Sequence, residues 1–510
     1  MVTNVSSGGV FGADLNQLVA HYPQRHALID AVHEQRHSYQ GLAILIQRLQ
    51  ATLESWQIGA GEVVVSLLPN SVEQLSLFLA ALYSGRHFAP LSPQCTAIEL
   101  AHWLKVTQAK VCLLTTLSSP AQQQAVREAG VTLQLVALDG QFEWAQTEQR
   151  SVKAEPQGGS RLYLHTSGTK GEPKALVIDA NTLWQAGQAF VALHPALHGG
   201  MRFFNIMPMS YLGGLFNLGL IPLVHGGSIV VAPPFSGRTL MTFWHDVKRF
   251  GVEALWLVPT VARGLLALYR PGKDERTTPR QTGIQYAFVG TAAITPEEKQ
   301  RFEACFGIPL LENYGLSETT FLTSEQPGQA QLRSLGSVGS VLPYVTLKLD
   351  HGPAEQPRPI RVRTPYAFVG YLGQDGEIRS PLDDEGYLHT DDLGLLDANG
   401  QLVLRGRTGD FIKKGGYFVS LVEIEALATT CPGVLEAVAV ATVSELYGDD
   451  YNLFIRCDGS MTEAPEAHFR QWMAERLVRY KWPCRIQVVE AFPRTESGKI
   501  QKRKLSVSEY

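Results

Sequence analysis

The feature that most constrains the fold is the alternation of short apolar runs with helical segments between residues 60 and 260. Residues 63–68 read Val-Val-Val-Ser-Leu-Leu, which is typical of a strand buried on both faces. A helix is predicted over 72–83, with Asn70 or Ser71 as its N-terminal cap. Further extended segments are predicted at 88–91, 110–114, 134–138, 202–206, 227–231 and 254–258. Strands that alternate with helices in this way predict βαβ units and parallel sheets.

The rest of the chain changes character twice. Residues 330–406 combine short apolar runs with many glycines, which predicts a small β-rich subdomain, and residues 410–510 return to a smaller α/β pattern. At 510 residues the chain is too long for a single core. We therefore predict an α/β protein with a large N-terminal domain at 1–408, made of two βαβ sheets and the β-rich subdomain. A small, mobile α+β C-terminal domain is predicted at 409–510, because Gly409 would permit a large backbone rotation.

Composition excludes several classes of protein. Hydrophobic residues make up 45% and charged residues 18%, and a net charge of −4 without runs of like charge gives no sign of nucleic-acid binding. The six cysteines include no Cys-x-x-Cys pair, so neither a zinc site nor a disulfide framework is expected. The N-terminus lacks the features of a signal peptide, and no apolar stretch is long enough to span a membrane. We expect a cytoplasmic protein.

Residues 164–175 read Leu-His-Thr-Ser-Gly-Thr-Lys-Gly-Glu-Pro-Lys-Ala and carry the most chemical information. Glycines let backbone N–H groups crowd around an anion, hydroxyls donate hydrogen bonds, and lysines offer point charges for phosphate oxygens. The order differs from the common P-loop, in which Ser or Thr directly follows Gly-Lys. An ordinary surface turn is the alternative. We predict a loop that binds a polyphosphate through Thr166, Ser167, Gly168, Thr169, Lys170, Gly171 and Lys174.

A second informative segment is Glu-Asn-Tyr-Gly-Leu-Ser-Glu-Thr at 312–319. An aromatic residue beside a glycine offers a stacking face for a planar base, and the carboxylate of Glu318 could hold Mg²⁺ against phosphates. Taken alone, the octapeptide is better explained as the end of a strand with an incidental glutamate.

Three more segments nearer the C-terminus suit a nucleotide or a catalytic group. At 386–394, one of two adjacent aspartates could accept the hydroxyls of a ribose, although tandem aspartates are also common on solvated turns. Residues 406–417 combine an arginine, two lysines and several glycines. Residues 493–500, Pro-Arg-Thr-Glu-Ser-Gly-Lys-Ile, place Lys499 on a glycine-containing loop that domain motion could carry into a site. A basic tail is the alternative for that loop.

In order along the chain, these five segments resemble the motifs of the adenylate-forming superfamily of acyl-CoA synthetases, adenylation domains and luciferases. The first matches Thr-Ser-Gly-Thr-x-Gly-x-Pro-Lys, and the last nearly matches Pro-x-Thr-x-Ser-Gly-Lys-Ile. A Gly-Thr-Ala-Ala run at 290–293 precedes 312–319 at about the family's separation. The resemblance covers residues 164–505. Two positions depart from it, because Asp391 replaces a glycine and Gly409 replaces a charged hinge residue.

The resemblance implies an enzyme that joins a carboxylic acid to the α-phosphate of ATP, releases pyrophosphate and transfers the acyl group to a thiol. Lys499, Thr166 and Glu318 would be catalytic, with Lys499 between the carboxylate and the α-phosphate and Glu318 on Mg²⁺. Rotation about Gly409 would then bring in a thiol-entry loop of Lys413, Lys414, Gly415 and Gly416. Further nucleotide contacts are implied for Ser167, Gly168, Thr169, Lys170, Gly171, Lys174, Gly290, Thr291, Ala292, Asn313, Tyr314, Gly315, Ser317, Asp392 and Arg407.

The acid pocket that the resemblance implies departs most from the family. Tyr211 stands where many CoA ligases have histidine, and no aspartate is present for an α-ammonium group, which implies an acid without a free α-amino group. Thr320 and Phe321 follow at positions where small residues are usual and would narrow the pocket. We therefore expect a small or medium acid. The predicted pocket residues, for each of which core packing is an equal alternative, are Tyr211, Leu212, Gly213, Asn217, Gly290, Thr320 and Phe321.

The acceptor stays open at this point. CoA is the favoured acceptor, but the phosphopantetheine of a carrier protein presents the same thiol arm, so the motifs do not separate the two. A luciferase-like oxygenase is a remote alternative, because the pocket would have to hold a large luciferin. A non-catalytic binding protein is disfavoured by the joint presence of Lys499, Glu318 and Asp392. The oligomeric state does not follow from the sequence.

Overall fold

The computed structural model of the protein divides the chain into two compact units. The first comprises 1–346 and 363–386, and the second comprises 347–362 and 387–510. The predicted domain boundary at 408/409 lies inside the second unit, so a mobile C-terminal domain stays a prediction. The residues that the structure describes are 10–144, 159–166, 174–197, 199–270, 283–327, 333–353, 355–414, 417–444, 448–459, 465–495, 498 and 500–505.

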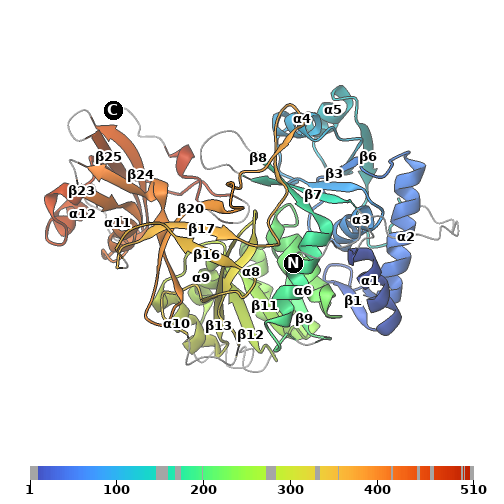
Figure 1. Ribbon diagram of the computed structural model, residues 1–510, viewed down its shortest axis with the longest axis horizontal. Helices are drawn as coiled ribbons and strands as arrows, with labels where there is room; N and C mark the ends of the chain where they lie inside the picture. The colour runs from blue at the N-terminus through green and yellow to red at the C-terminus, as the bar shows by residue number, and fades with distance from the viewer. Residues whose placement is uncertain are drawn as a thin grey trace. The chain divides into compact units, whose positions relative to one another are not determined.

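The first unit contains a nine-stranded sheet in the order β15-β14-β13-β12-β11-β9-β10-β1-β2. Figure 1 labels β1, β9, β11, β12 and β13 of this sheet. The strands from β1 through β10, β9, β11 and β12 to β13 are parallel, and antiparallel strands flank them on both sides. The strand bounds are β1 His26–Asp30, β2 Arg36–Ser38, β9 Arg202–Asn205, β10 Ser228–Val231, β11 Ala254–Leu257, β12 Tyr286–Val289, β13 Leu310–Leu316, β14 Thr320–Ser324 and β15 Ser340–Val341.

The same unit contains an eight-stranded sheet in the order β19-β18-β8-β7-β4-β3-β5-β6. Strands β7, β4, β3, β5 and β6 are parallel, which confirms the βαβ pattern predicted for this part of the chain. The strand bounds are β3 Val63–Ser66, β4 His87–Pro90, β5 Val111–Thr115, β6 Thr132–Val136, β7 Arg161–Thr166, β8 Lys174–Asp179, β18 Gly370–Leu372 and β19 Ile378–Arg379.

Helices cover both sheets of the first unit. Helix α3 begins where predicted, because the Ser71 hydroxyl accepts a hydrogen bond from the Gln74 N–H, and every residue of this helix is buried. Helix α6 packs against β8 of one sheet and β14 of the other. Among the described residues, no helix is long and apolar enough to cross a membrane. The helices are α1 Val10–His21, α2 Tyr39–Ser55, α3 Val72–Tyr83, α4 Ala97–Val106, α5 Pro120–Glu128, α6 Ala180–Ala192, the π-helix Gly213–Leu220, α7 Ile221–Val224, α8 Gly237–Phe250, α9 Pro259–Leu268 and α10 Pro296–Phe306.

The second unit contains two smaller sheets. Its four-stranded sheet has the order β16-β17-β20-β21, and its other sheet has the order β23-β22-β25-β24 with β26 beside β25. The core of the second sheet packs against α11 and α12 through Ile424, Tyr451 and Phe469. The bounds are β16 Thr346–Leu349, β17 Arg358–Arg363, β20 Leu388–Leu396, β21 Leu402–Arg407, β22 Phe411–Lys414, β23 Tyr417–Ser420, α11 Leu421–Ala428, β24 Val434–Ser444, β25 Gly448–Cys457, α12 Pro465–Ala474 and β26 Arg485–Val488.

Candidate active site

Strands β7 and β8 support the predicted phosphate loop. They are antiparallel neighbours in which Thr166 pairs with Lys174 and His165 pairs with Ala175. The structure therefore brings the backbones of Thr166 and Lys174 together at the base of the loop. The loop itself lies outside the described residues, and with it the predicted contacts Ser167, Gly168, Thr169, Lys170 and Gly171.

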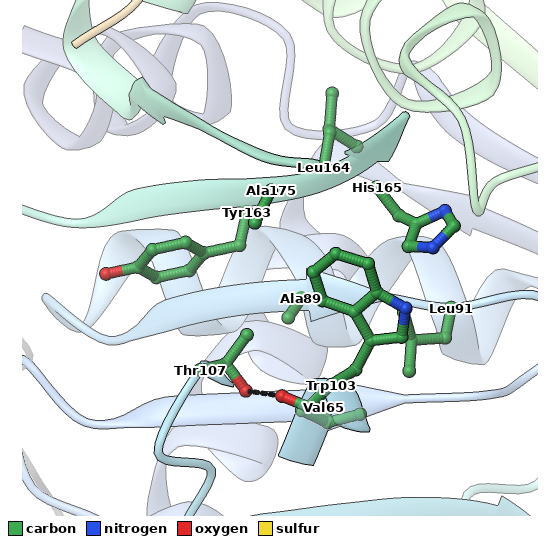
Figure 2. Close-up of a pocket in the computed structure, with 9 residues that line it drawn as sticks. All are labelled: Val65, Ala89, Leu91, Trp103, Thr107, Tyr163, Leu164, His165 and Ala175. Atoms are coloured by element: carbon green, nitrogen blue, oxygen red, sulfur yellow. Dashed lines mark hydrogen bonds between the residues drawn. The ribbon is translucent and has the colours of Figure 1, made fainter. Parts of the chain in front are cut away.

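A small cavity lies at this base, between the eight-stranded sheet and α4 (Figure 2). Figure 2 shows the His165 ring beside the indole of Trp103, and the two rings meet edge to face with their centroids 4.3 Å apart. Burial lowers the pKa of His165, so the ring is neutral at pH 7. The cavity is part of the core beneath the loop, since its lining is mostly apolar: Val65, Ala89, Leu91, Trp103, Thr107, Tyr163, Leu164, His165 and Ala175.

The other predicted contacts of the first unit start from one edge of the nine-stranded sheet. Strands β9, β11, β12 and β13 are parallel, so their carboxyl ends meet at the same edge. Ligands of open α/β sheets bind at that edge. Three segments leave the sheet at this edge. The segment with Tyr211 follows β9, residues 290–292 follow β12, and the turn with Glu318 follows β13. The fold thus gathers three predicted contact segments that lie far apart in the sequence.

Gly290 and Asn313 lie against each other at this edge. A Cβ atom on Gly290 would lie 2.6 Å from the Asn313 Oδ1 and 2.9 Å from the Asn313 carbonyl oxygen, so only glycine fits without a shift of β13. The next residue, Thr291, has a φ of +72°, which is rare for a β-branched residue. The Asn313 Nδ2 is buried and has no hydrogen-bond partner among the described residues.

The hairpin of β13 and β14 is packed closely around a strained turn. A Cβ atom on Gly315 would overlap the Thr320 carbonyl oxygen, so the close approach of the strands requires glycine here. Thr320 has a φ of +58°, is 5% exposed, and has a hydroxyl with no partner among the described residues. Backbone strain and unpaired buried groups persist where the surroundings fix the conformation, and they gather at functional sites.

Glu318 follows in the turn of this hairpin. Its carboxylate Oε1 accepts a hydrogen bond of 2.8 Å from the Tyr371 hydroxyl, and its carbonyl accepts one of 2.8 Å from the Phe368 N–H. Burial and then the negative charge of Glu318 raise the pKa of Tyr211. The structure thus brings Glu318 together with Tyr371, a residue that sequence reasoning did not select.

The segment that carries Tyr211 is held by two buried asparagines. The Asn70 amide donates to the Met207 carbonyl at 2.7 Å and accepts from the Met209 N–H at 2.8 Å. The Asn205 amide donates to the Gly214 and Leu218 carbonyls at 2.8 and 3.1 Å. Those carbonyls belong to a π-helix, a form that is rare and frequent at functional sites. Of the predicted pocket residues, Leu212 and Gly213 are buried here and Asn217 is half-buried.

Phe321 lies in a packed aromatic cluster. Its ring centroid is 4.4 Å from that of Phe190, 5.1 Å from that of Trp256 and 5.7 Å from that of Phe216. The side chain is 6% exposed. The ring thus packs against α6, the π-helix and β11, and a role of Phe321 in the acid pocket stays a prediction.

In the second unit, the structure brings together the predicted residues Asp392 and Arg407. They are paired across β20 and β21, and the Arg407 Nε donates to the Asp392 carboxylate at 2.8 Å. Asp391, where the family has glycine, has a φ of +60°. The left-handed conformation explains the usual glycine, and aspartate is among the few other residues that adopt it readily.

The predicted hinge and thiol-entry residues also belong to the second unit. Gly409 lies in a short 3₁₀ turn, Thr408–Asp410, where an added Cβ would meet no described atom within 4 Å. Lys413 pairs with Phe418 in the β22–β23 hairpin. Lys414 is 6% exposed and donates to the Asp450 carboxylate and the Trp482 carbonyl at 2.6 and 2.7 Å. Its ammonium group is therefore part of the interior of this unit, and the thiol-entry role of the loop stays a prediction.

Three predicted residues of this unit lie outside the described residues: Gly415, Gly416 and Lys499. The chain on either side of Lys499 is held, because Arg494 and Ile500 form an antiparallel bridge and the Arg494 Nη1 donates to the Gly498 carbonyl at 2.9 Å.

Comparison with known proteins identifies the class. The pattern of the AMP-binding enzyme family matches residues 15–372, and that of the AMP-binding enzyme C-terminal domain matches residues 423–499. The chain belongs to the AMP-binding enzyme family.

Three relatives with assigned activities are CoA ligases. The sulfoacetate–CoA ligase of Cupriavidus necator is 29% identical over 88% of both chains. The oxalate–CoA ligase of Arabidopsis thaliana is 28% identical over 96% of both chains. The 2-succinylbenzoate–CoA ligase of Bacillus cytotoxicus is 28% identical over 88% of this chain and 89% of the relative. The protein is thus an acid–thiol ligase of the AMP-forming type.

Solved structures share the fold. ATP-bound MatB from Rhodopseudomonas palustris is 24% identical, with a TM-score of 0.83 over 96% of this chain and 97% of that chain. The anthranilate CoA ligase AuaEII in complex with anthranoyl-AMP is 20% identical, with a TM-score of 0.84 over 99% of this chain and 98% of that chain. The predicted α/β architecture, with a large N-terminal and a small C-terminal part, is confirmed.

Proposed function

We propose that this enzyme activates a small or medium carboxylic acid without a free α-amino group as its acyl adenylate and then transfers the acyl group to CoA. The observation that carries the proposal is the Glu318 carboxylate, which accepts a hydrogen bond from Tyr371 and follows β13 at the sheet edge from which the segment with Tyr211 leaves β9. This edge offers a carboxylate for a metal–nucleotide complex. It also offers the phenol of Tyr211, at the position where an enzyme that activates amino acids needs an anion for the α-ammonium group.

Glu318 suits Mg²⁺ better than a metal that needs a protein cage. Among the described residues, no group of three or more His, Cys, Asp or Glu could hold a metal ion. Mg²⁺ is usually bound through one or two carboxylates together with substrate phosphates and water, so a single carboxylate fits it. Tyr371 fixes the orientation of that carboxylate through Oε1. When bound, Mg²⁺ would offset the charge of the triphosphate, whose β- and γ-phosphates are assigned to Thr166, Ser167, Thr169 and Lys174.

The second unit supplies the remaining roles in this proposal. Asp392 is assigned to the ribose hydroxyls and Arg407 to the ribose or a phosphate, and their ion pair holds both side chains in a defined orientation. Lys499 is assigned to the acid and the α-phosphate, where one ammonium group lowers the repulsion between two anions. Rotation about Gly409 would exchange Lys499 for the loop around Lys413 before the thiol attacks.

The size of the acid follows from the aromatic cluster around Phe321. This ring and its partners Phe190, Phe216 and Trp256 fill the space behind β14 with side chains in direct contact. Interiors packed in this way do not admit extra methylene groups without cost. A long alkyl chain therefore has no place in that direction, which favours a short or single-ring acid. Two of the relatives, named for sulfoacetate and oxalate, agree with a small acid.

The acceptor is proposed as CoA because the relatives with assigned activities are CoA ligases. The test is acid-dependent release of pyrophosphate from ATP across a panel of carboxylic acids, followed by detection of the CoA ester by mass spectrometry. Reactions with a phosphopantetheinylated carrier protein in place of CoA provide the comparison. Acylation of the carrier without formation of a CoA ester would contradict the proposed acceptor, and absence of acid-dependent pyrophosphate release would contradict the whole proposal.

A further inference from the structure

A buried lysine lies behind the hairpin that carries Glu318. Lys299 is 2% exposed, and its ammonium group contacts the Glu312 Oε1 at 2.9 Å and the two carboxylate oxygens of Glu325 at 2.8 and 2.7 Å. Both glutamates are also buried, at 7% and 3% exposure. These three side chains, called the Lys299 triad below, take no part in the chemistry proposed above.

The Lys299 triad sits where β13 changes partners. Up to Glu312, β13 pairs in parallel with β12, and from Asn313 onward it pairs in antiparallel with β14. Glu325 closes this junction, because its N–H donates to the Glu312 carbonyl and its carboxylate accepts from the Glu312 N–H, both at 2.8 Å. Lys299 comes from α10, the helix that connects β12 to β13, so one ammonium group ties that helix to β13 and to the residue that directly follows β14.

Stability alone does not account for such a triad. Removing charges from water is costly, and apolar residues of similar volume often stabilise a protein as well as a buried ion group does. What an ion group adds is geometry, because two carboxylates and one ammonium group satisfy one another in few arrangements. The neighbouring Arg333 extends the group, with its Nε 3.4 Å from Glu325 and its Nη2 2.5 Å from Glu303. The arrangement defines one register for the start of the hairpin.

We propose that Lys299 is a positioning residue for the adenylation step: through Glu312 and Glu325 it fixes the β13–β14 hairpin, and with it the place of Glu318. The proposal rests on the proposed function in that Glu318 serves the metal–nucleotide complex. Five residues separate Glu312 from Glu318, and between them lie the close contact at Gly315 and the exit from the parallel sheet. A small shift in strand register at the junction therefore also moves the Glu318 carboxylate.

The test uses the full-length enzyme with all three members of the triad changed to methionine: Lys299→Met, Glu312→Met and Glu325→Met. This variant removes the charges together and leaves none of the three unpaired. Two readouts are taken. Hydrogen exchange of the backbone amides of 313–318 is measured by mass spectrometry, and KM for MgATP is measured in the pyrophosphate-release assay. We expect faster exchange in this segment and a KM raised roughly tenfold, the lower end of what loss of a supporting contact around a metal ligand costs.

Controls separate positioning from folding and from loss of charge. Arg301→Met removes an exposed cation from the same helix and should change neither readout. Lys299→Arg keeps the charge with a different shape, so it serves if the triple variant does not fold, and the same two changes are expected from it. Thiolation of a supplied acyl adenylate should stay near the parent rate in the folded variant.

Parent-like exchange and parent-like KM in a folded variant would overturn the proposal, because Lys299 would then support the fold alone. The exchange readout does not depend on the reaction. A parent enzyme that releases no pyrophosphate would therefore refute the proposed function and leave the positioning result to be decided by exchange.

Discussion

Replacing Thr320 with glycine tests whether the β13–β14 hairpin stores strain. The left-handed conformation costs a non-glycine residue roughly 1–2 kcal/mol, and an unpaired buried hydroxyl costs about 1–3 kcal/mol. Thr320 carries both, with a φ of +58° and a buried Oγ1 that has no partner among the described residues. Against this, the substitution loses about 0.8 kcal/mol for the buried methyl group and about 0.5–1 kcal/mol for the freedom of glycine in the unfolded chain.

These terms predict that Thr320→Gly changes the free energy of unfolding by between about 0 and +4 kcal/mol, so the variant is as stable as the parent or more stable. This is the opposite of the usual result for truncation of a buried side chain. The measurement is urea denaturation followed by tryptophan fluorescence, which reports on this region because Trp256 stacks on Phe321 with centroids 5.1 Å apart.

Thr323→Gly in the same strand is the matched control. Thr323 is fully buried, its φ is not in the left-handed region, and its hydroxyl donates to the Val338 carbonyl at 2.5 Å. Loss of that hydrogen bond, of the methyl group and of backbone restraint predicts a destabilisation of about 2–3 kcal/mol. Equal destabilisation by Thr320→Gly and Thr323→Gly would refute the strain argument.

Thr320→Gly also tests the predicted acid pocket. If Thr320 faces the acid, its removal should extend the accepted acids by a few carbons, because an added methylene in a full pocket costs roughly 1–3 kcal/mol. The assay is acid-dependent pyrophosphate release over a series of chain lengths and ring sizes, in the parent and in Thr320→Gly. A parent that prefers acids of about twelve carbons or more, or a variant with an unshifted profile, would show that this residue does not limit the acid.

Three further substitutions test the assigned roles. Lys499→Ala should lower adenylate formation on the order of 100-fold or more and spare thiolation of a supplied acyl adenylate, so unimpaired pyrophosphate release would contradict its role. Gly409→Pro fixes φ and should trap one arrangement, giving an enzyme that performs one half-reaction; equal losses in both halves would count against the hinge. Tyr371→Phe removes the hydrogen bond to Glu318 and should raise the Mg²⁺ concentration for half-maximal rate roughly tenfold at constant ATP. A Mg²⁺ curve that coincides with the parent's would separate Tyr371 from the metal.

The elements that could be predicted from the sequence are those with local causes. The strand at 63–68 and the helix at 72–83 are set by an unbroken apolar run and by the Ser71 cap, and the structure has β3 at Val63–Ser66 and α3 at Val72–Tyr83. Tyr371 could not be found in the same way, because it lies 53 residues after Glu318 and meets it only through the pairing of β18 in the other sheet.

The Lys299 triad left a partial signal in the sequence. Lys299 lies three residues before Phe302 and seven before Phe306, so it occupies a position of the apolar stripe of α10. A charge in such a stripe indicates a buried partner. Which carboxylates those are depends on the register of β13 and β14, which helix periodicity does not reveal.

Lys414 of β22 shows the opposite case, in which the local pattern did not reveal a buried partner. Lys414 faces the interior, where Asp450 balances its charge. Asp450 lies 36 residues further along the chain, in β25, so the pattern of 406–417 alone does not reveal it.

Backbone strain gives an independent reason to place function in the first unit. Among the described residues, seven non-glycine residues have a left-handed φ, and both β-branched ones, Thr291 and Thr320, lie in predicted contact segments. Thr291 follows Gly290, and Thr320 lies opposite Gly315. A Cβ atom on either glycine would collide with the neighbouring strand. Because these backbone conformations cost stability, natural selection for a stable fold alone would replace them with unstrained ones. A variant that relieves the strain, such as Thr320→Gly, should therefore gain stability and lose kcat/KM for its preferred acid together.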